Sequence, residues 1–419
     1  MRPIVASIHA PATLLSQYLN DLLAPIYLFE ARATTFTNSI DVVRRLKKYE
    51  NDGYMTAKTQ FIVTDVKDMY TMIPRQGALE ALAGFCIRHS KQGKIGPFTI
   101  DHIMKIARLI LDTNTFVYND TYYRQIRGGA MGSAFTQVLA NIYMYQWEQH
   151  LIAYQAAKNE IFGRYLDDIL MTTNGTMDEM KQLLERVGNK DVNIKINYQI
   201  DRTVDFLDVS ISNEDSRLRT KIYHKPAAEP YILPFTSTHP QHIQRNIPYG
   251  AIVRAVRICS NLPDFHSELC HIDISLLLNG YPPNFIRKQF NRLFQSTPIV
   301  SMLDGMNEQS YRQLHHRLLH QPTRHEQQLK KMMINPIESP SVLQPYVWNK
   351  QIMFPHYLFD HTRLGQLRRA FMDWWSKHFA FPDSSLCEVK VRLVGDTQKT
   401  LEKFLIQKKP RRELLTKME

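Results

Sequence analysis

Residues 165–168 of this chain are Tyr165-Leu166-Asp167-Asp168, and short apolar runs flank them at 161–165 and 169–172. Two such runs around a short polar stretch predict a β-hairpin that carries both aspartates at its tip. A third acidic residue, Asp65, follows Phe61-Ile62-Val63-Thr64, an apolar run that is typical of a buried strand. If these strands are neighbours in one antiparallel sheet, the three carboxylates converge at its edge.

Three carboxylates in that position would be the ligands of a two-metal phosphoryl-transfer site. Mg²⁺ is a hard cation that takes oxygen ligands, and two ions about 4 Å apart clamp the attacking and leaving oxygens. We expect Asp65 and Asp167 to bridge both ions and Asp168 to support one of them, with Mn²⁺ able to replace Mg²⁺. The alternative is that Asp167-Asp168 is only a polar turn and that Asp65 only ends a strand. The motifs around them favour the metal site.

The overall charge of the chain suits a polyanionic partner. Its 419 residues are enough for two or three domains, and 52 Lys and Arg against 40 Asp and Glu give a formal net charge of +12. Nucleic acid is the first candidate for such a partner, and an anionic membrane is the second. The four cysteines form no Cys-x-x-Cys pair, which is typical of free thiols in a reducing compartment. Because no apolar stretch reaches 18 residues and no signal pattern is present, we expect an intracellular protein without a membrane partner.

The periodicity of apolar residues predicts a mixed α+β region up to about residue 225 and a helical region after it. Helices are expected at 35–49, 78–89, 100–111 and 133–154. Hairpins are expected at 116–123, with Asn119-Asp120 at the turn, and at 206–224, around Asn213-Glu214-Asp215. This order suits an antiparallel sheet with a helical lobe behind it.

Two further motifs lie between the acidic ones. Tyr70 follows Asp65 by five residues, where its ring could pack under the sugar of an incoming nucleotide and exclude a 2′-hydroxyl; an ordinary core tyrosine is the alternative. Gly128-Gly129-Ala130-Met131-Gly132-Ser133 precedes the long predicted helix. Its glycines would let the backbone approach a base pair, and the helix N-terminus offers N–H groups to phosphates. Such a segment is also common as plain turn chemistry.

In this order the motifs resemble those of reverse transcriptases, and more narrowly those of Penelope-like elements, relatives of the telomerase catalytic subunit. The matching segments are Arg2-Pro3-Ile4-Val5, residues 64–66 and 70–74, Gly129-Ala130-Met131-Gly132-Ser133, residues 139–144, Tyr165-Leu166-Asp167-Asp168 and Phe206-Leu207-Asp208-Val209. Further on, His239-Pro240 with Arg245, and Asn279-Gly280-Tyr281-Pro282, are similar to the thumb of the family. The resemblance covers residues 1 to about 295 and is weaker from Val389 onward.

The resemblance implies a right-hand polymerase fold and the synthesis of DNA on an RNA template, from a DNA primer and dNTPs. It makes Asp65, Asp167 and Asp168 the metal ligands. The residues that it places at the nucleotide are Arg2, Val66, Tyr70, Gly129, Gly132, Ser133 and Lys195. Lys195 is a candidate proton donor to the leaving pyrophosphate, although a solvated lysine is the alternative. Phe206, Leu207 and Asp208 would begin the hairpin that grips the primer end.

The same resemblance divides the chain into partial fingers at 1–60, a palm at 61–225 with a finger insertion at about 75–125, a helical thumb at 226–335, and a linker with a basic C-terminal region at 336–419. The predicted thumb residues that would contact the nucleic-acid backbone are His242, Arg245, Arg254, Arg257, Arg287, Lys288 and Arg292. Each phosphate that they neutralise would steepen the salt dependence of binding, although some of them could be ordinary surface charges. The basic run at 408–412 is a candidate nuclear-import signal, so a nuclear location is expected.

The chain departs from the family pattern in three places. Ala134 stands where the family usually has proline after Gly-Ser. The chain begins at the second finger motif, so we expect only partial fingers and a truncated or decaying copy of the element. The Gly-Ile-Tyr and Tyr-Ile-Gly strings of the family's endonuclease do not occur, so no DNA cleavage is expected. Two rival hypotheses stay open: a catalytically silent nucleic-acid-binding remnant, and an RNA-templated RNA polymerase, which the ring of Tyr70 disfavours.

Overall fold

The computed structural model describes residues 10–118, 121–226, 230, 232–237, 239, 241–295, 306–324, 326–329, 351–358 and 364–396. The chain divides into two compact units, each of which is described by itself. Unit 1 consists of Met1–His224, Val256–Asp264 and Tyr311–Val342, and unit 2 of Lys225–Ala255, Phe265–Ser310 and Leu343–Glu419. Arg2, the expected linker at 336–350 and the basic run at 408–412 lie outside the described residues.

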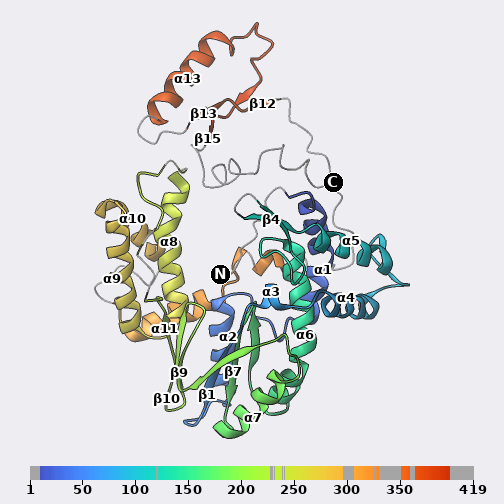
Figure 1. Ribbon diagram of the computed structural model, residues 1–419. Coiled ribbons are helices and arrows are strands. Elements are labelled where there is room, and N and C mark those ends of the chain that lie inside the picture. The colour runs from blue at the N-terminus through green and yellow to red at the C-terminus, as the bar shows by residue number, and fades with distance from the viewer. Residues whose placement is uncertain are drawn as a thin grey trace. The chain divides into compact units, whose positions relative to one another are not determined.

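Unit 1 contains a four-stranded antiparallel sheet. Its strands are β1 (Gln60–Val66), β6 (Phe162–Tyr165), β7 (Asp168–Thr173) and β8 (Ile196–Asp201), of which β1 and β7 are labelled in Figure 1. Their order is β6-β7-β1-β8, and every neighbouring pair is antiparallel. With α6 (Ala134–Ala157) before β6 and α7 (Met177–Gly188) between β7 and β8, this is the β-α-β-β-α-β arrangement of ferredoxin-like folds. The predicted hairpin at 161–172 and its neighbour at 61–66 are confirmed, but the turn holds only Leu166 and Asp167, because Asp168 already pairs as the first residue of β7.

Helices bury one face of this sheet. The long predicted helix after the glycines is confirmed as α6, whose apolar side chains join β1, β6 and β7 in one hydrophobic core. The same core contains apolar residues of α1 (Thr13–Glu30), α4 (Arg75–His89) and α5 (Ile100–Asp112). Figure 1 shows α1 and α4 beside α6. The predicted helices at 78–89 and 100–111 are therefore also present.

The helix expected at 35–49 begins later, as α2 (Ser39–Asn51). Asn38 is its N-cap, and the side chain of Asn38 accepts a hydrogen bond from the Asp41 N–H. Residues 34–36 instead run alongside β6, because the Arg164 N–H donates to Thr34 O at 2.9 Å and the Phe36 N–H donates to Arg164 O at 2.8 Å. Residues 35 and 36, which the sequence pattern assigned to the helix, therefore pair with a strand instead.

A second antiparallel sheet consists of β9 (Thr203–Phe206), β10 (Val209–Glu214) and β11 (Arg217–Ile222) in the order β11-β10-β9. Two expectations are wrong here. Phe206 ends β9 rather than beginning the next strand, and Leu207-Asp208 is a two-residue turn. The β10–β11 turn is Asp215-Ser216, not 213–215, and both residues have positive φ, as a type I′ turn requires.

The remaining elements of unit 1 are short. They are α3 (Met69–Met72) and the strand pairs β2 (Lys94–Ile95) with β3 (Phe98–Thr99) and β4 (Thr115–Tyr118) with β5 (Thr121–Arg124). The strands of the hairpin expected at 116–123 are present, and its turn at 119–120 lies outside the described residues.

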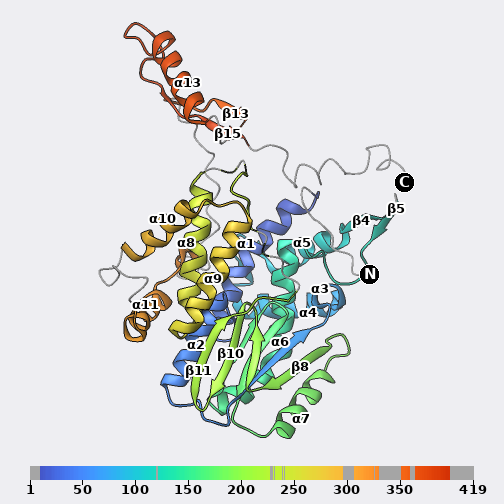
Figure 2. The same cartoon turned by 90° about the vertical axis from the view of Figure 1, so that its left-hand side faces the viewer.

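Unit 2 is mostly helical. It contains most of α8 (Gln241–Ile258) and α9 (Leu262–Leu278) and all of α10 (Pro283–Gln295), a group visible in Figure 2. The Phe235 ring packs edge-to-face on Tyr281 and Phe285, with ring centroids 5.2 Å apart in both pairs. Most of α11 (Glu308–His320) belongs to unit 1.

Near the C-terminus of unit 2, α13 (Leu364–His378) follows two short strands and precedes two more, and each strand before the helix pairs in parallel with one after it. The pairs are β12 (Ile352–Met353) with β14 (Lys390–Val391) and β13 (His356–Leu358) with β15 (Val394–Asp396). Among all the helices described, none has the length and the apolar content needed to cross a membrane.

Candidate active site

One row of residues crosses the four-stranded sheet at the end of β1. Asp65 is directly opposite Asp168 of β7 on one side and Asn197 of β8 on the other, and Asp168 is opposite Tyr165 of β6. Directly opposite residues in an antiparallel pair have Cα atoms about 4.5–5.5 Å apart, and their side chains point to the same face. The carboxylates of Asp65 and Asp168 therefore lie on one face of the sheet. The Asp65 side chain is exposed and that of Asp168 is half-buried.

Asp167 lies in the turn next to this row. Leu166 and Asp167 join β6 to β7, and Leu166 has a φ of +55°, in the left-handed region that residues other than glycine rarely occupy. The Val66 N–H donates to Asp167 O at 3.0 Å, which ties the turn to the end of β1. The backbones of all three predicted ligands are therefore adjacent, although Asp65 and Asp167 are 102 residues apart in sequence.

Aspartate oxygens are the ligand type that Mg²⁺ prefers. Within the part of the chain that the structure describes, however, no three His, Cys, Asp or Glu side chains are arranged so that they could hold a metal ion. Register brings the acidic residues together, but their carboxylates do not form a ready cage. Like charges repel, so we expect the carboxylates to draw together only when cations offset that repulsion.

Tyr70, on α3, lies close enough to Asp167 for the two to interact electrostatically. Burial raises the pKa of the Tyr70 phenol to about 12, and the negative charge of Asp167 adds to the rise. The Gly129 N–H donates to Tyr70 O at 2.9 Å, and the Gly128 N–H donates to Ile73 O at 3.1 Å. The glycine segment is therefore bonded to the helix that carries Tyr70. Tyr70, Gly128 and Gly129 also line a small pocket, about 10 Å³ in volume, which is room for a single water.

Three residues expected at a nucleotide have roles inside the fold. Ser133 is buried, and its hydroxyl is 2.7 Å from the Ser16 hydroxyl of α1, so it does not face a ligand. The Val66 side chain is part of the hydrophobic core. Gly129 is buried, and a Cβ there would lie 2.6 Å from the Thr136 side chain, so close packing explains the glycine. The Ser133 hydroxyl and the Val66 side chain are therefore corrected as nucleotide contacts, because packing inside the fold occupies them. The expectation for the Gly129 backbone stays a prediction.

Gly132 and Lys195 are exposed. Lys195 directly precedes β8, and its carbonyl accepts a hydrogen bond from the Lys67 N–H at 2.9 Å. This bond extends the β1–β8 pairing past Val66, so Lys195 lies at the same end of the sheet as Asp65.

The expected primer-grip residues also make contacts inside the fold. Phe206 is buried, and its ring packs on Phe36 with centroids 5.8 Å apart. Asp208 accepts a hydrogen bond from the Ser39 hydroxyl at the start of α2, and its carbonyl accepts one from the Tyr223 N–H at 3.0 Å. Leu207 is half-buried. The turn is present, and the Phe206 side chain lies in the core rather than at the surface.

Six of the seven expected backbone-binding residues are exposed on the helices of unit 2. They are His242, Arg245 and Arg254 on α8, and Arg287, Lys288 and Arg292 on α10. The Arg292 guanidinium also lies over the Tyr249 ring, 5.2 Å from its centroid.

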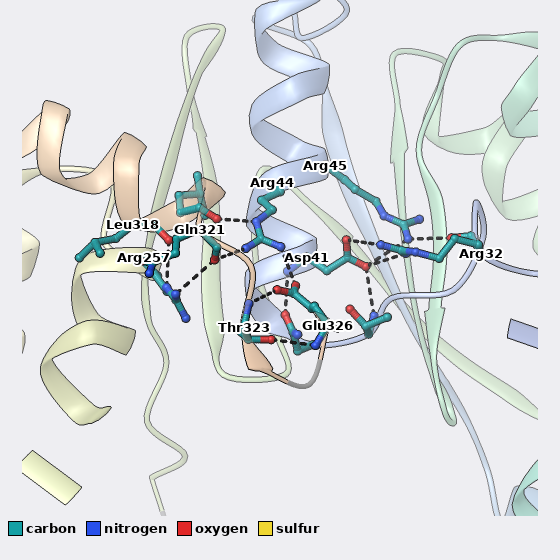
Figure 3. A network of polar contacts seen from close by, with 12 residues as sticks. Arg32, Asp41, Arg44, Arg45, Arg257, Leu318, Gln321, Thr323 and Glu326 are labelled. Carbon is teal, nitrogen blue, oxygen red and sulfur yellow. Dashed lines mark hydrogen bonds and ion pairs between the residues drawn. The ribbon is translucent and has the colours of Figure 1, made fainter. Parts of the chain in front are cut away.

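Arg257 is the exception. It belongs to unit 1 and is half-buried, and its guanidinium donates to Leu318 O at 3.0 Å and to Gln321 O at 3.2 Å (Figure 3). A cation at the C-terminus of a helix satisfies carbonyls that lack partners within the helix. Arg257 therefore holds the end of α11, and the expectation that it binds nucleic acid is corrected.

A family model described as an animal helix-turn-helix domain matches residues 231–291, which hold α8, α9 and most of α10. A search of curated proteins finds no match.

Three of the solved structures to which the chain is similar are nucleic-acid polymerases. The telomerase of Candida tropicalis in complex with a fragment of telomeric RNA is 11% identical, with a TM-score of 0.44 over 76% of this chain and 56% of that chain. The telomerase of Candida albicans in complex with such a fragment is 11% identical, with a TM-score of 0.43 over 74% and 58%. The RNA-dependent RNA polymerase of bacteriophage phi12 is 12% identical, with a TM-score of 0.37 over 74% and 49%. This chain thus spans about half the length of each of these proteins, and its likeness to them is too low to indicate an activity.

Proposed function

We propose that this chain is an RNA-directed DNA polymerase that extends a primer 3′-hydroxyl with dNTPs on an RNA template. It would be a retroelement enzyme of the Penelope-like class. The observation that supports this most is the register that sets Asp65 opposite Asp168, with Asp167 in the adjoining turn. The order of the motifs along the chain adds to it.

In this proposal Asp65, Asp167 and Asp168 hold two Mg²⁺ ions, supplied from two paired strands and the turn between β6 and β7. When bound, the ions would lower the pKa of the primer hydroxyl and neutralise the triphosphate. Asp65 is exposed and Asp168 is half-buried, so both could reach ions at this face of the sheet. Lys195, exposed at the same end of the sheet, is the candidate proton donor to pyrophosphate.

Tyr70 would select deoxyribonucleotides. Its pKa of about 12 keeps the phenol neutral at any physiological pH, so the ring adds no anion beside Asp167. A neutral ring at that place can lie against a deoxyribose and leave no room for a 2′-hydroxyl.

The exposed basic residues on α8 and α10 would bind nucleic-acid phosphates. They are His242, Arg245, Arg254, Arg287, Lys288 and Arg292. Their charge suits a duplex backbone, and contacts of this kind carry no sequence information. A nuclear location, where such a substrate is present, is part of the same proposal.

The second candidate is a nucleic-acid-binding protein without catalytic activity. Within the described residues no three His, Cys, Asp or Glu side chains are arranged to hold a metal ion, which agrees with a decayed polymerase and equally with an active one before its ions bind. Both candidates predict RNA binding, and only the polymerase predicts extension of a primer.

The deciding experiment is primer extension by the purified chain on a primed RNA template with dNTPs and Mg²⁺. We expect extension by the wild-type chain and none by Asp167→Ala. Asp205→Ala is the matched control, because it removes an exposed carboxylate on β9 and should leave the rate unchanged. Binding of the primed RNA should be equal in all three proteins. If wild type and Asp167→Ala both bind but neither extends a primer in Mg²⁺ or Mn²⁺, the non-catalytic candidate is correct.

A further inference from the structure

Arg164, the residue before Tyr165, is one of the most deeply buried charged side chains described, with only 1% of its surface exposed. It is opposite Ile169 in the β6–β7 pair, on the other face of the sheet from Asp65 and Asp168. Its side chain points toward α6 and α1, into the core. A buried guanidinium is unfavourable unless every one of its N–H groups has a partner.

All five side-chain N–H groups of Arg164 have a hydrogen-bond partner. Nε donates to Glu148 Oε2 at 2.7 Å, and Nη1 donates to Asn141 Oδ1 and to Leu166 O, both at 2.8 Å. Nη2 donates to the Tyr27 hydroxyl at 2.9 Å and to Asn141 O at 3.3 Å. The guanidinium therefore connects α1 and α6 to the turn that carries Asp167.

The bond to Leu166 O is the one that bears on the candidate active site. Leu166 has a φ of +55°, and a residue other than glycine keeps such a conformation only where its surroundings enforce it. The next carbonyl, that of Asp167, accepts from the Val66 N–H. Both carbonyls of the turn are thus held, one by Arg164 from the core and one by β1 from the side. Arg164 is itself fixed by backbone bonds to residues 34 and 36.

We propose that Arg164 is a positioning residue, which holds the Leu166–Asp167 turn in the shape that lets Asp167 and Asp168 reach the metal ions. This rests on the proposed polymerase function. Lysine cannot replace it, because an ammonium has three donors on one atom and lacks the planar fork that reaches Glu148, Asn141 and Leu166 together. Glu148 is the counter-charge that makes the buried arginine tolerable.

A second hairpin offers a control within the same chain. Its turn, Leu207-Asp208, has the same two residue types, and Leu207 has a φ of +56°. That turn is held by contacts to Ser39 and Tyr223. A change at Arg164 should therefore loosen the 165–168 turn and leave the 206–209 turn as it is.

The test uses the full chain with Arg164→Lys and with the double variant Arg164→Met/Glu148→Leu. The double variant leaves no buried charge without a partner, and replacing a buried ion pair by apolar residues is often neutral for stability. Three quantities are measured: the melting temperature, amide hydrogen exchange in peptides covering 162–173 and 203–210, and steady-state primer extension against Mg²⁺ concentration.

We expect the double variant to melt within about 5 °C of wild type. Exchange in 162–173 should rise by on the order of ten-fold, while exchange in 203–210 stays unchanged. In extension, kcat should fall about 100-fold, as expected for a misplacement of roughly 1 Å, while the KM for primed template is unchanged and more Mg²⁺ is required. Arg164→Lys, which keeps the charge but not the fork, should change in the same direction.

The proposal is overturned if the double variant protects the 162–173 amides as wild type does, or if exchange rises equally in both peptides. The second result would mean that Arg164 only supports the fold. If the double variant does not fold, Arg164→Lys decides by the same exchange comparison. If the wild-type chain extends no primer, the proposed function fails, and hydrogen exchange still decides whether Arg164 holds the turn.

Discussion

At the scale of single residues, Gly128 packs directly against the backbone of Tyr70. Its φ is +62°, and a Cβ added there would lie 2.2 Å from the Tyr70 carbonyl oxygen. That same carbonyl accepts a hydrogen bond from the Gly129 N–H. A side chain at position 128 would therefore push on the backbone that carries Tyr70, and the glycine is required both by its φ and by the lack of space.

Gly128→Ala should lower the free energy of unfolding by roughly 3 kcal/mol, since it combines a left-handed φ with a backbone clash. Gly53→Ala is the matched control, because Gly53 has a φ of +80° but nothing within 4 Å of the added Cβ. It should cost only about 1 kcal/mol, the strain alone. Urea denaturation of both variants checks this, and equal losses would mean that the contact with Tyr70 is unimportant.

Tyr70→Ala should raise the incorporation of ribonucleotides relative to deoxyribonucleotides by about 10- to 100-fold, because the ring that fills the 2′ position is gone. Tyr70→Phe keeps the ring and should keep the discrimination. Since the wild-type phenol has a pKa of about 12, it is protonated below that pH, and Tyr70→Phe should not alter the pH dependence of the rate between about pH 7 and 9. Single-nucleotide extension with each nucleotide type measures both effects. Loss of discrimination in Tyr70→Phe would show that the hydroxyl, not the ring, matters.

At the scale of elements, the C-terminus of α11 shows how helices far apart in sequence are joined. Arg44 of α2 donates to Gln321 O at 3.1 Å and pairs with Glu326 at 2.6 Å, and Arg257 donates to Leu318 O and Gln321 O (Figure 3). Two arginines thus donate hydrogen bonds to carbonyl groups at the C-terminal end of one helix, where the helix dipole also favours positive charge.

Arg257→Ala should therefore lower the free energy of unfolding by about 2 kcal/mol, because two charge-assisted hydrogen bonds at the helix end are lost. Arg287→Ala, the same change at an exposed position, should stay within about 0.5 kcal/mol of wild type. Thermal and urea unfolding measure the free energy of unfolding of both variants. A stable Arg257→Ala protein would return Arg257 to the set of candidate nucleic-acid contacts.

At the scale of the whole molecule, the net charge of +12 is the property most relevant to a nucleic-acid partner. Part of that charge lies exposed on α8 and α10 of unit 2, and part, as at Arg164 and Arg257, is used inside unit 1. The net charge alone does not separate these two kinds of arginine.

The affinity for a primed RNA template should fall steeply between 50 and 200 mM salt, at a slope that counts the phosphates contacted. Arg287→Ala should make the slope of log K against log salt shallower by about 1. Arg257→Ala should leave the slope unchanged, the reverse of its effect on stability. Filter binding or fluorescence anisotropy over a salt series tests this, and an unchanged slope in Arg287→Ala would remove that part of α10 from the interface.

Local patterns were enough to predict part of unit 1, although α1, α7 and β8 were not predicted. The hairpin around 165–168, the strand at 61–66 and the helices α4, α5 and α6 follow from apolar periodicity and turn residues, which act over a few neighbours. The errors arose where a partner distant in the chain takes over. Residues 34–36 pair with β6 instead of starting a helix, and Phe206 ends a strand instead of beginning one.

The sequence by itself predicted the residue types of the candidate site: two adjacent aspartates between two strands, one aspartate at a strand end, a tyrosine and a glycine segment. Only the tertiary structure decided that Asp65 is opposite Asp168, that Ser133 bonds to Ser16, and that Arg164 holds the turn from beneath. The physical reason is the distance along the chain over which each interaction acts. Turn chemistry and periodicity depend on adjacent residues. Strand register instead depends on which face of the sheet is buried, and a buried charge is stabilised by partners that folding brings from elsewhere in the chain.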